Sequence, residues 1–255
     1  MRKLSMALLA GVALVGCGVD PQAENQEIIS NLLEAGFPAD DIMVHEDAVY
    51  VGRDAHVTLE ASREMLQTGK QTAEQYRTTN LVDTSSVKKI CVVPTATFNT
   101  YSQLSAGLDL AIDNYNSLNL AFTLVRGSAS DCDATISAKT TTGAGGSSGF
   151  PKGGKPYGTI NIGTGLQSYS TDVNEHVITH EIGHTIGFRH SDYYDRSISC
   201  GGTATNEGAS NVGAILIPGT PSTAKVGGSI MNSCFRSSET GEWSTSDKTA
   251  LDYLY

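Results

Sequence analysis

The residues of this chain best suited to chemistry lie between His180 and His190, a run that reads H-E-x-x-H-x-x-G-x-x-H. On a helix, His180 and His184 are one turn apart on the same face, so both imidazoles can reach one cation. Glu181 lies beside that face, where its carboxylate can accept a proton from a water that the cation activates. Two imidazoles on a rigid helix, a third protein ligand and a water are typical of a catalytic zinc site.

Gly187 and His190 complete the motif. A glycine at this position can adopt a positive φ, which ends the helix and turns the chain. The turn brings His190 back as the third ligand. Because the extended motif fixes five residues, a chance match in a chain of this length is expected on the order of once in ten thousand. The pattern therefore favours one catalytic Zn²⁺ over a helix with solvated histidines.

A rival third ligand is present downstream. Residues 206–211, Asn-Glu-Gly-Ala-Ser-Asn, resemble the N-E-x-x-S-D helix that supplies a glutamate ligand in thermolysin-like enzymes. Glycines at positions 201, 202, 208 and 213 oppose a helix there. A Glu207 ligand would also leave Gly187 and His190 without a role, so the three-histidine set is preferred.

The elements that must position this motif form a catalytic unit over residues 84–255. Apolar and β-branched runs predict strands, and apolar residues at helical spacing predict a long helix that backs them. The motif helix follows these elements, and a second helix ends the chain. The ranges are strands at 89–94, 120–125, 134–139 and 159–162, and helices at 102–119 and 246–255.

Three local features belong to the cleft and the motif helix. Residues 141–158 are rich in Gly, Ser and Lys, which indicates a mobile cleft rim rather than core. The strand that follows, Thr159, Ile160, Asn161 and Ile162, is expected to bind substrate by backbone pairing. Asp172, with Glu175 three residues later, is the expected N-cap of the motif helix.

The sequence resembles two nested groups of proteins. The motif, with Ser229-Ile230-Met231-Asn232 downstream, resembles the metzincin clan of zinc endopeptidases, whose Met-turn lies beneath the metal. Residues 179–184 (THEIGH), together with residues 144–151 and 217–221, resemble the dual-action HEIGH metallopeptidases over about residues 85–255.

The resemblance implies an α+β metzincin-like fold: a mixed twisted sheet, a backing helix, an active-site helix, and a small loop-rich C-terminal subdomain ending in a helix. It also implies His180, His184 and His190 as zinc ligands, Glu181 as the base, and Met231 as the Met-turn. Ser233 stands where astacin- and serralysin-like metzincins have a tyrosine, so no tyrosine switch is assigned. A structural Ca²⁺ remains open, without residues that support it.

Residues 1–16 are typical of an export signal, with Arg2 and Lys3 before an apolar run too short to span a bilayer. Leu14-Val15-Gly16-Cys17 resembles a bacterial lipobox, which implies lipidation of Cys17; the alternative is an ordinary cleaved signal peptide. Gly18 rather than Asp follows Cys17, which favours an outer-membrane or cell-surface lipoprotein. Later processing would release it to the extracellular space.

Export fits the remaining four cysteines, because an even number in an oxidising compartment predicts two disulfides. Three pairings are open. We favour Cys91–Cys132 and Cys200–Cys234, which tie first one side of the motif helix and then the other. The formal net charge of −10 opposes nucleic-acid binding and favours solubility. The chain is expected to be a monomer.

Residues 17–83 are interpreted as a lipid-anchored N-terminal segment that is either a pro-segment over the cleft or a permanent spacer; we favour the former. Residues 24–36 and 60–67 predict helices, 41–59 alternate like strands, and 69–83 look like a polar linker. A pro-segment without cysteine between Gly18 and Ile90 needs another blocking ligand, and Asp54 is the candidate. The alternative is that Asp54 is a solvated turn residue.

The function predicted from these residues is a secreted or lipid-anchored zinc endopeptidase that acts on proteins or peptides. The alternative is a non-catalytic surface-binding lipoprotein that keeps a metzincin scaffold. The intact Glu181 opposes this alternative, because a dead scaffold has no physical need for a carboxylate beside the metal.

Overall fold

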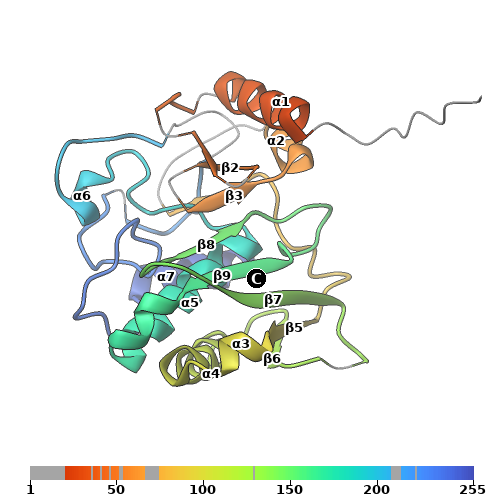
Figure 1. Ribbon diagram of the computed structural model, residues 1–255, viewed down its shortest axis with the longest axis vertical. Coiled ribbons are helices and arrows are strands. Elements are labelled where there is room, and N and C mark those ends of the chain that lie inside the picture. The colour runs from red at the N-terminus through yellow and green to blue at the C-terminus, as the bar shows by residue number, and fades with distance from the viewer. Residues whose placement is uncertain are drawn as a thin grey trace, which may run out of the picture.

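The computed structural model describes residues 21–255, with the exception of residues 36, 41, 46, 52–53, 67–74, 129, 208–213 and 222. Within these residues, eight strands form one sheet in the order β1-β2-β3-β8-β9-β7-β5-β6 (Figure 1). Strands β5 (Lys89–Pro94), β6 (Thr123–Arg126), β7 (Ala134–Thr141) and β9 (Thr159–Gly163) are mutually parallel. Strand β8 (Gly146–Gly149) runs antiparallel to β9, so the predicted mixed sheet is confirmed.

Helices α4 (Ser102–Asn116) and α5 (Thr171–Ile186) pack against each other and share one core with the sheet. Short helices α3 (Ala96–Asn99) and η1 (Thr164–Ser168) lie in the connections that lead to them. Strand β7 shows that one face of the sheet is covered. Ile136 and Ala138 on that face are buried, while Thr135 and Lys139 on the opposite face are exposed. This alternation is typical of a sheet with a helical layer on one face and solvent on the other. Helix α4 is the predicted backing helix.

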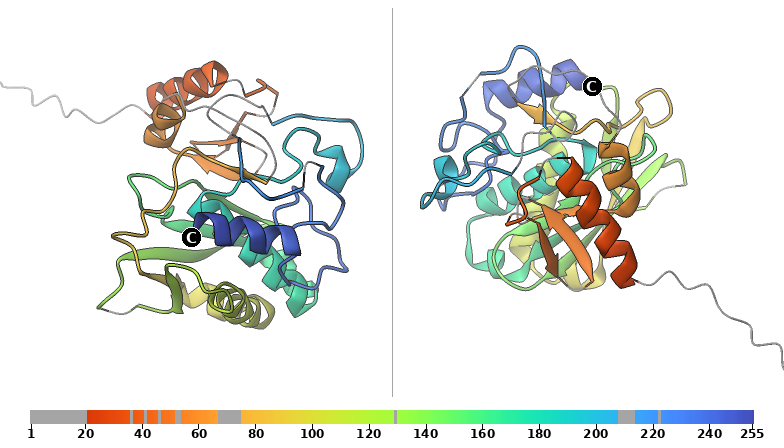
Figure 2. Two further views of the ribbon diagram at one scale, coloured as in Figure 1. Left: turned by 180° about the vertical axis from the view of Figure 1, so that it is seen from behind. Right: turned by 90° about the horizontal axis from the view of Figure 1, so that it is seen from above.

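The N-terminal segment extends the same sheet. It contains α1 (Pro21–Glu34), β1 (Met43–His45), β2 (Ala48–Val51), β3 (Ala55–Val57) and α2 (Leu59–Met65). Strands β1 to β3 form an antiparallel meander, and β3 pairs in parallel with β8, with Ala55 opposite Ser148. Phe150, just after β8, is buried in the small core of this segment. Figure 2 shows α1 and α2 on the same side of the molecule, over β2 and β3.

Residues 75–83 differ from the predicted polar linker. Strand β4 (Tyr76–Arg77) pairs with β10 (Ile215–Leu216), and the carbonyl of Tyr76 accepts a 2.7 Å hydrogen bond from the backbone N–H of Arg189. The backbone N–H of Thr78 donates to the carbonyl of Gly187 at 2.8 Å. These bonds hold the chain just after the motif helix, so the linker interpretation is wrong for residues 75–83. Residues 67–74 lie outside the described residues.

The glycine-rich stretch is also more ordered than predicted. Residues 146–149 form β8, the side chain of Ser148 is fully buried, and Phe150 is 1 % exposed. Small residues suit this strand because it lies directly against α5 and β9, where larger side chains would clash. The interpretation as a mobile rim is therefore wrong for residues 146–150.

Strand β9 lies inside the sheet rather than at its rim. Asn161 and Ile162 pair with β7 on one side and with β8 on the other. A substrate strand cannot be added where both edges of a strand are occupied, so the prediction of substrate pairing along Thr159, Ile160, Asn161 and Ile162 is wrong for Asn161 and Ile162. The strand on the outer side of β9 is β8.

The C-terminal part is built mostly from loops, with α6 (Ser197–Cys200) and the final helix α7 (Thr245–Leu254). Disulfides join Cys91 to Cys132 and Cys200 to Cys234. The first links β5 to the turn before β7, and the second links α6 to the loop that follows Met231. In the described part of the chain, no helix is both long and apolar enough to cross a membrane.

Candidate metal centre

Helix α5 carries two of the three histidines and is enclosed on all sides. Its N-cap is Ser170, whose side chain accepts a hydrogen bond from Val173 N, so the predicted N-cap at Asp172 is wrong. Asp172 instead lies in the first turn, where its charge complements the helix dipole. Every residue from Val173 to Ile186 is buried. Gly187 ends the helix with a φ of +118°, which confirms the predicted turn.

The three imidazoles face one another. The ring centroids of His180 and His184 lie 4.7 Å apart, and those of His184 and His190 lie 4.8 Å apart. The Nε2 atoms of His184 and His190 are separated by 3.2 Å. Metal-ligating atoms of Asp54 and the three histidines all fall within 4.8 Å of one another. This spacing suits a single small cation.

Each imidazole is oriented by an acceptor behind it. His180 Nδ1 lies 2.8 Å from the carbonyl of Ile230, and His184 Nδ1 lies 2.8 Å from the carbonyl of Phe188. Because a carbonyl oxygen only accepts, both Nδ1 atoms carry the proton. Each Nε2 then offers a lone pair to the shared centre. The residues present therefore fit a divalent metal bound through three Nε2 atoms.

Burial keeps two of the three imidazoles uncharged. It lowers the pKa of His180 well below its usual value, and it lowers the pKa of His184 to about 4. Both imidazoles are neutral at pH 7, which is the form that binds a metal. Burial alone would also lower the pKa of His190, but the charges of Asp54 and Glu207 raise it to about 10. Two carboxylates thus act as counter-ions to His190.

Glu181 lies next to the imidazoles on the inner side of β8. It is 2 % exposed, and its Oε2 has no hydrogen-bond partner. Burial, followed by the charge of Asp54, raises the pKa of Glu181 well above its usual range. The backbone carbonyl of Glu181 accepts a 2.9 Å hydrogen bond from Ser148 Oγ. A buried carboxylate with a free oxygen beside the centre is placed to accept and return a proton.

Met231 packs beneath the motif helix at the glycine between the two histidines. A Cβ atom on Gly183 would lie 2.6 Å from Met231 Sδ, so helix and thioether are in direct contact. Met231 is 1 % exposed, and its carbonyl accepts a 2.8 Å bond from the backbone N–H of Ser191. The turn at Ile230 and Met231 therefore bonds both to His180, through the Ile230 carbonyl, and to the segment that carries His190.

Sequence reasoning missed the residue that holds this turn. Asp247 at the start of α7 accepts hydrogen bonds from Ser229 Oγ at 2.5 Å and from Ile230 N at 3.0 Å. It also forms a capping box with Ser244. The S-x-x-D pattern at the start of the last helix was the available signal, although it does not reveal the contact with the turn.

The shape of the Met231 side chain should matter more than its sulfur. We expect Met231→Leu to lower the free energy of unfolding by less than about 1.5 kcal/mol, because it roughly conserves volume. Met231→Ala should lower it by about 2–5 kcal/mol, because it leaves a cavity beneath Gly183. Denaturant unfolding of both variants checks this. Equal losses would contradict the packing role.

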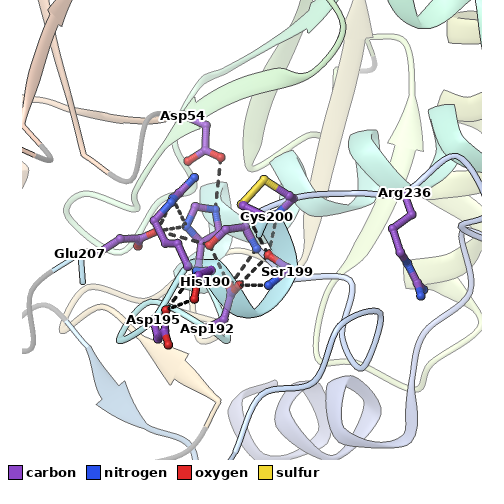
Figure 3. The surroundings of a disulfide bond; sticks show 12 residues. Asp54, His190, Asp192, Asp195, Ser199, Cys200, Glu207 and Arg236 are labelled. Atoms are coloured by element: carbon purple, nitrogen blue, oxygen red, sulfur yellow. Dashed lines mark hydrogen bonds and ion pairs between the residues drawn. A yellow bond between two sulfur atoms is a disulfide. The ribbon is translucent and has the colours of Figure 1, made fainter. Parts of the chain in front are cut away.

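Asp54 reaches the centre from the N-terminal segment. Its Oδ2 lies 3.2 Å from His190 Nε2, and its other oxygen is buried without a partner (Figure 3). The side chain is 18 % exposed, and its backbone carbonyl accepts a 3.1 Å bond from Ser148 N. Asp54 is therefore beside the histidines rather than solvated in a turn. It lines the cavity of about 300 Å³ that Glu181 and His180 also line.

Glu207, the ligand of the rival interpretation, lies on the other side of His190. Its Oε1 is 2.5 Å from His190 Nδ1, the ring nitrogen that points away from the shared centre. Its carboxylate is not among the described groups that could hold a metal together. The geometry supports the three-histidine set, and it puts Glu207 behind His190 rather than among the groups that face the shared centre.

Comparison with known families gives a match to the model of the dual-action HEIGH metallopeptidases over residues 49–255. The chain belongs to this family. The match starts well upstream of residue 85, where the sequence resemblance begins, and so includes β3 and Asp54. As a HEIGH metallopeptidase, the chain is a metal-binding hydrolase of proteins or peptides.

Two solved structures of myroilysin are similar to this HEIGH metallopeptidase. Both are 16 % identical to it and cover 69 % of its chain. One match covers 86 % of the myroilysin chain with a TM-score of 0.39, and the other covers 97 % with a TM-score of 0.41. A comparison with curated proteins gives no match. The observed architecture of mixed sheet, backing helix and motif helix is consistent with a metzincin-like fold.

Proposed function

We propose that the chain is a zinc-dependent endopeptidase of metzincin type, with His180, His184 and His190 as ligands and Glu181 as the general base. The observation that carries this proposal is the convergence of three imidazoles, with at least two Nδ1 atoms fixed by backbone carbonyls, next to a buried carboxylate. Zinc held there would supply Lewis acidity, which polarises a carbonyl and lowers the pKa of a water.

Glu181 performs the proton transfers in this mechanism. Its free Oε2 accepts a proton from the attacking water and later passes it to the leaving amine. The raised pKa of Glu181 has burial as its first cause, and it suits a group that must carry a proton between two steps. Asp54 would have to withdraw, because it occupies the space that a substrate needs.

The edge of β8 is the proposed docking strand for substrate. It borders Glu181, and pairing an extended peptide with it would add a strand to the sheet. In the present structure β3 occupies that edge, with His56 opposite Gly149. Substrate and β3 would compete for the same backbone groups.

Gly146 in β8 gives a test of this arrangement. A Cβ atom at Gly146 would lie 2.5 Å from Glu181 Cγ and closer still to its Oε1. Since β8 is bonded to its neighbours, the glutamate must move. We expect Gly146→Ala to lower kcat/KM about 100-fold while zinc content is unchanged.

Gly158→Ala is the matched control, because a Cβ there meets Thr135 O at an ordinary 3.8 Å. Casein digestion and metal analysis of both variants check the expectation. Full activity of Gly146→Ala would show that Glu181 is not confined by β8.

The position of Asp54 supports a latent form. We propose that residues 21–66 are a pro-segment in which Asp54 lies on the metal centre and β3 covers the docking edge. Cleavage within residues 67–74 would separate this segment while keeping residues 75–83, which pack against the motif turn. The proposed cut thus lies at the N-terminal end of the predicted linker, before the residues that pack against the motif turn.

Export and lipidation of Cys17 remain proposals. They rest on the signal-like residues 1–16, which lie outside the described residues, and on the two disulfides, which suit an oxidising compartment. We propose an outer-membrane or cell-surface lipoprotein, a monomer with protein or peptide substrates, whose catalytic part is released by the cut.

Metal analysis of the purified chain alongside casein digestion tests the proposed ligand set. His190→Ala should lose most of its zinc and its activity. Retention of both in this variant would overturn the three-histidine centre.

A further inference from the structure

We propose that Glu207 is a positioning residue that fixes His190 as a metal ligand. This inference rests on the proposed zinc centre and deepens it. Glu207 is the residue that a thermolysin-like interpretation makes a ligand, yet the structure sets it behind the third histidine.

The contact is direct and enclosed. Glu207 Oε1 lies 2.5 Å from His190 Nδ1, and both side chains are 1 % exposed. Figure 3 shows Asp54 and Glu207 approaching His190 from two sides. Asp54 is near Nε2, whereas Glu207 is near Nδ1. The metal-facing and protein-facing nitrogens of His190 are thereby distinguished.

The carboxylate determines the tautomer. An ionised carboxylate only accepts, so His190 Nδ1 donates to it, and Nε2 is the nitrogen that carries the lone pair when the ring is neutral and binds a metal. Arg196 Nη1 lies 3.4 Å from the same Nδ1, but an arginine cannot accept a proton from it. The Arg196 contact therefore belongs to Glu207 rather than to the ring.

Glu207 is itself held by two buried cations. Arg189 Nη2 lies 3.1 Å from Glu207 Oε2, and Arg196 Nη1 donates to Oε1. These two guanidinium groups are counter-ions of the Glu207 carboxylate at a place where both partners are buried. The backbone N–H of Glu207 also donates to the carbonyl of Tyr193 at 2.7 Å. The carboxylate is thus paired with two cations and anchored to the chain.

His190 needs this anchor more than the other two ligands. His180 and His184 stand on α5 and donate to backbone carbonyls, which no substitution can remove. His190 lies beyond the helix, after Gly187, in a segment without regular secondary structure. Its orientation therefore depends on a side chain from a separate loop, and that side chain can be changed.

The zinc dissociation constant of the full chain, measured by competition with a chelator of known affinity, tests the inference. We expect Glu207→Ala to weaken zinc binding about 10–100-fold, the usual effect of losing such a partner. Glu207→Gln keeps an acceptor oxygen without the charge, so its zinc dissociation constant should lie between those of wild type and Glu207→Ala. Glu175→Gln is the control. It removes a buried carboxylate of α5 that accepts a hydrogen bond from Asn114 and does not contact the three histidines, so its zinc affinity should match wild type.

A double-mutant cycle separates positioning from general stability. In a His190→Ala background, Glu207→Ala should change zinc affinity less than threefold, because the ring it orients is gone. An unchanged 10–100-fold loss in that background would overturn the proposal. Wild-type affinity in Glu207→Ala would overturn it too, whereas a wild-type chain that binds no zinc would overturn the proposed function itself.

Loss of Glu207 removes a buried carboxylate that pairs with two buried arginines, which can prevent folding. Nitrogen-15 NMR of the histidine rings in zinc-loaded wild type needs no variant. We expect His190 to carry its proton on Nδ1, in a hydrogen bond that slows exchange with solvent. A proton on Nε2, or a fast-exchanging Nδ1 proton, would contradict the positioning role.

Discussion

Glu181→Gln is expected to abolish peptide-bond cleavage while leaving zinc in place. The side chain keeps its size but loses the oxygen that accepts a proton from the attacking water. General bases contribute roughly 10²–10⁴-fold to such reactions, so kcat should fall by at least 100-fold. Zinc content should be unchanged, because the proposed ligands are the imidazoles of His180, His184 and His190. Casein digestion and metal analysis on the same sample give both numbers.

Glu175→Gln is the matched control for this variant. Glu175 is on the same helix and is 5 % exposed, but its partners are Asn114 and the loop at Gly241. Activity near wild type is expected there. If Glu181→Gln lost zinc together with activity, Glu181 would be acting as a ligand. If it kept its activity, another group would be the base.

Release of the N-terminal segment should raise activity by at least about 100-fold. A tethered segment competes with substrate at an effective concentration in the millimolar range, and this advantage disappears once it diffuses away. The full chain, cut by a protease within residues 67–74, should therefore cleave casein far faster than the uncut chain. Residues 75–83 must stay, since Tyr76 and Thr78 bond the backbone at Arg189 and Gly187.

Asp54→Ala in the uncut chain separates the two proposed effects of the N-terminal segment, which are the contact of Asp54 with the metal centre and the cover that β3 gives to β8. It frees the metal centre but leaves β3 on the edge of β8, so we expect a smaller rise than the cut produces. Asp40→Ala, an exposed residue of the same segment, should change nothing. Equal activity in uncut, cut and Asp54→Ala chains would make residues 21–66 a spacer.

The local part of the site could be predicted from the sequence. Helical periodicity puts His180 and His184 on one face, and a glycine at position 187 predicts the turn towards His190. These are short-range consequences of backbone geometry. Ser170 rather than Asp172 caps the helix, because both residue types suit that position and spacing alone does not choose between them.

The long-range part could not be predicted in this way. Glu207 reaches His190 across 17 residues and Asp247 reaches Ile230 across 17, through loops without a periodic pattern. Strand β8 lies in a glycine-rich stretch that has little strand propensity. It is a strand because its neighbours β9 and β3 supply hydrogen bonds and α5 leaves no room for larger side chains.

Zinc titration of the chelator-stripped chain, cut within residues 67–74, tests the central claim most directly. Bound zinc and casein cleavage are measured in the same samples. The predicted result is that activity rises in proportion to bound zinc and reaches its maximum at one ion per chain. Cleavage that does not depend on zinc would contradict the account, and so would one bound ion without any cleavage, which is the behaviour of a non-catalytic scaffold.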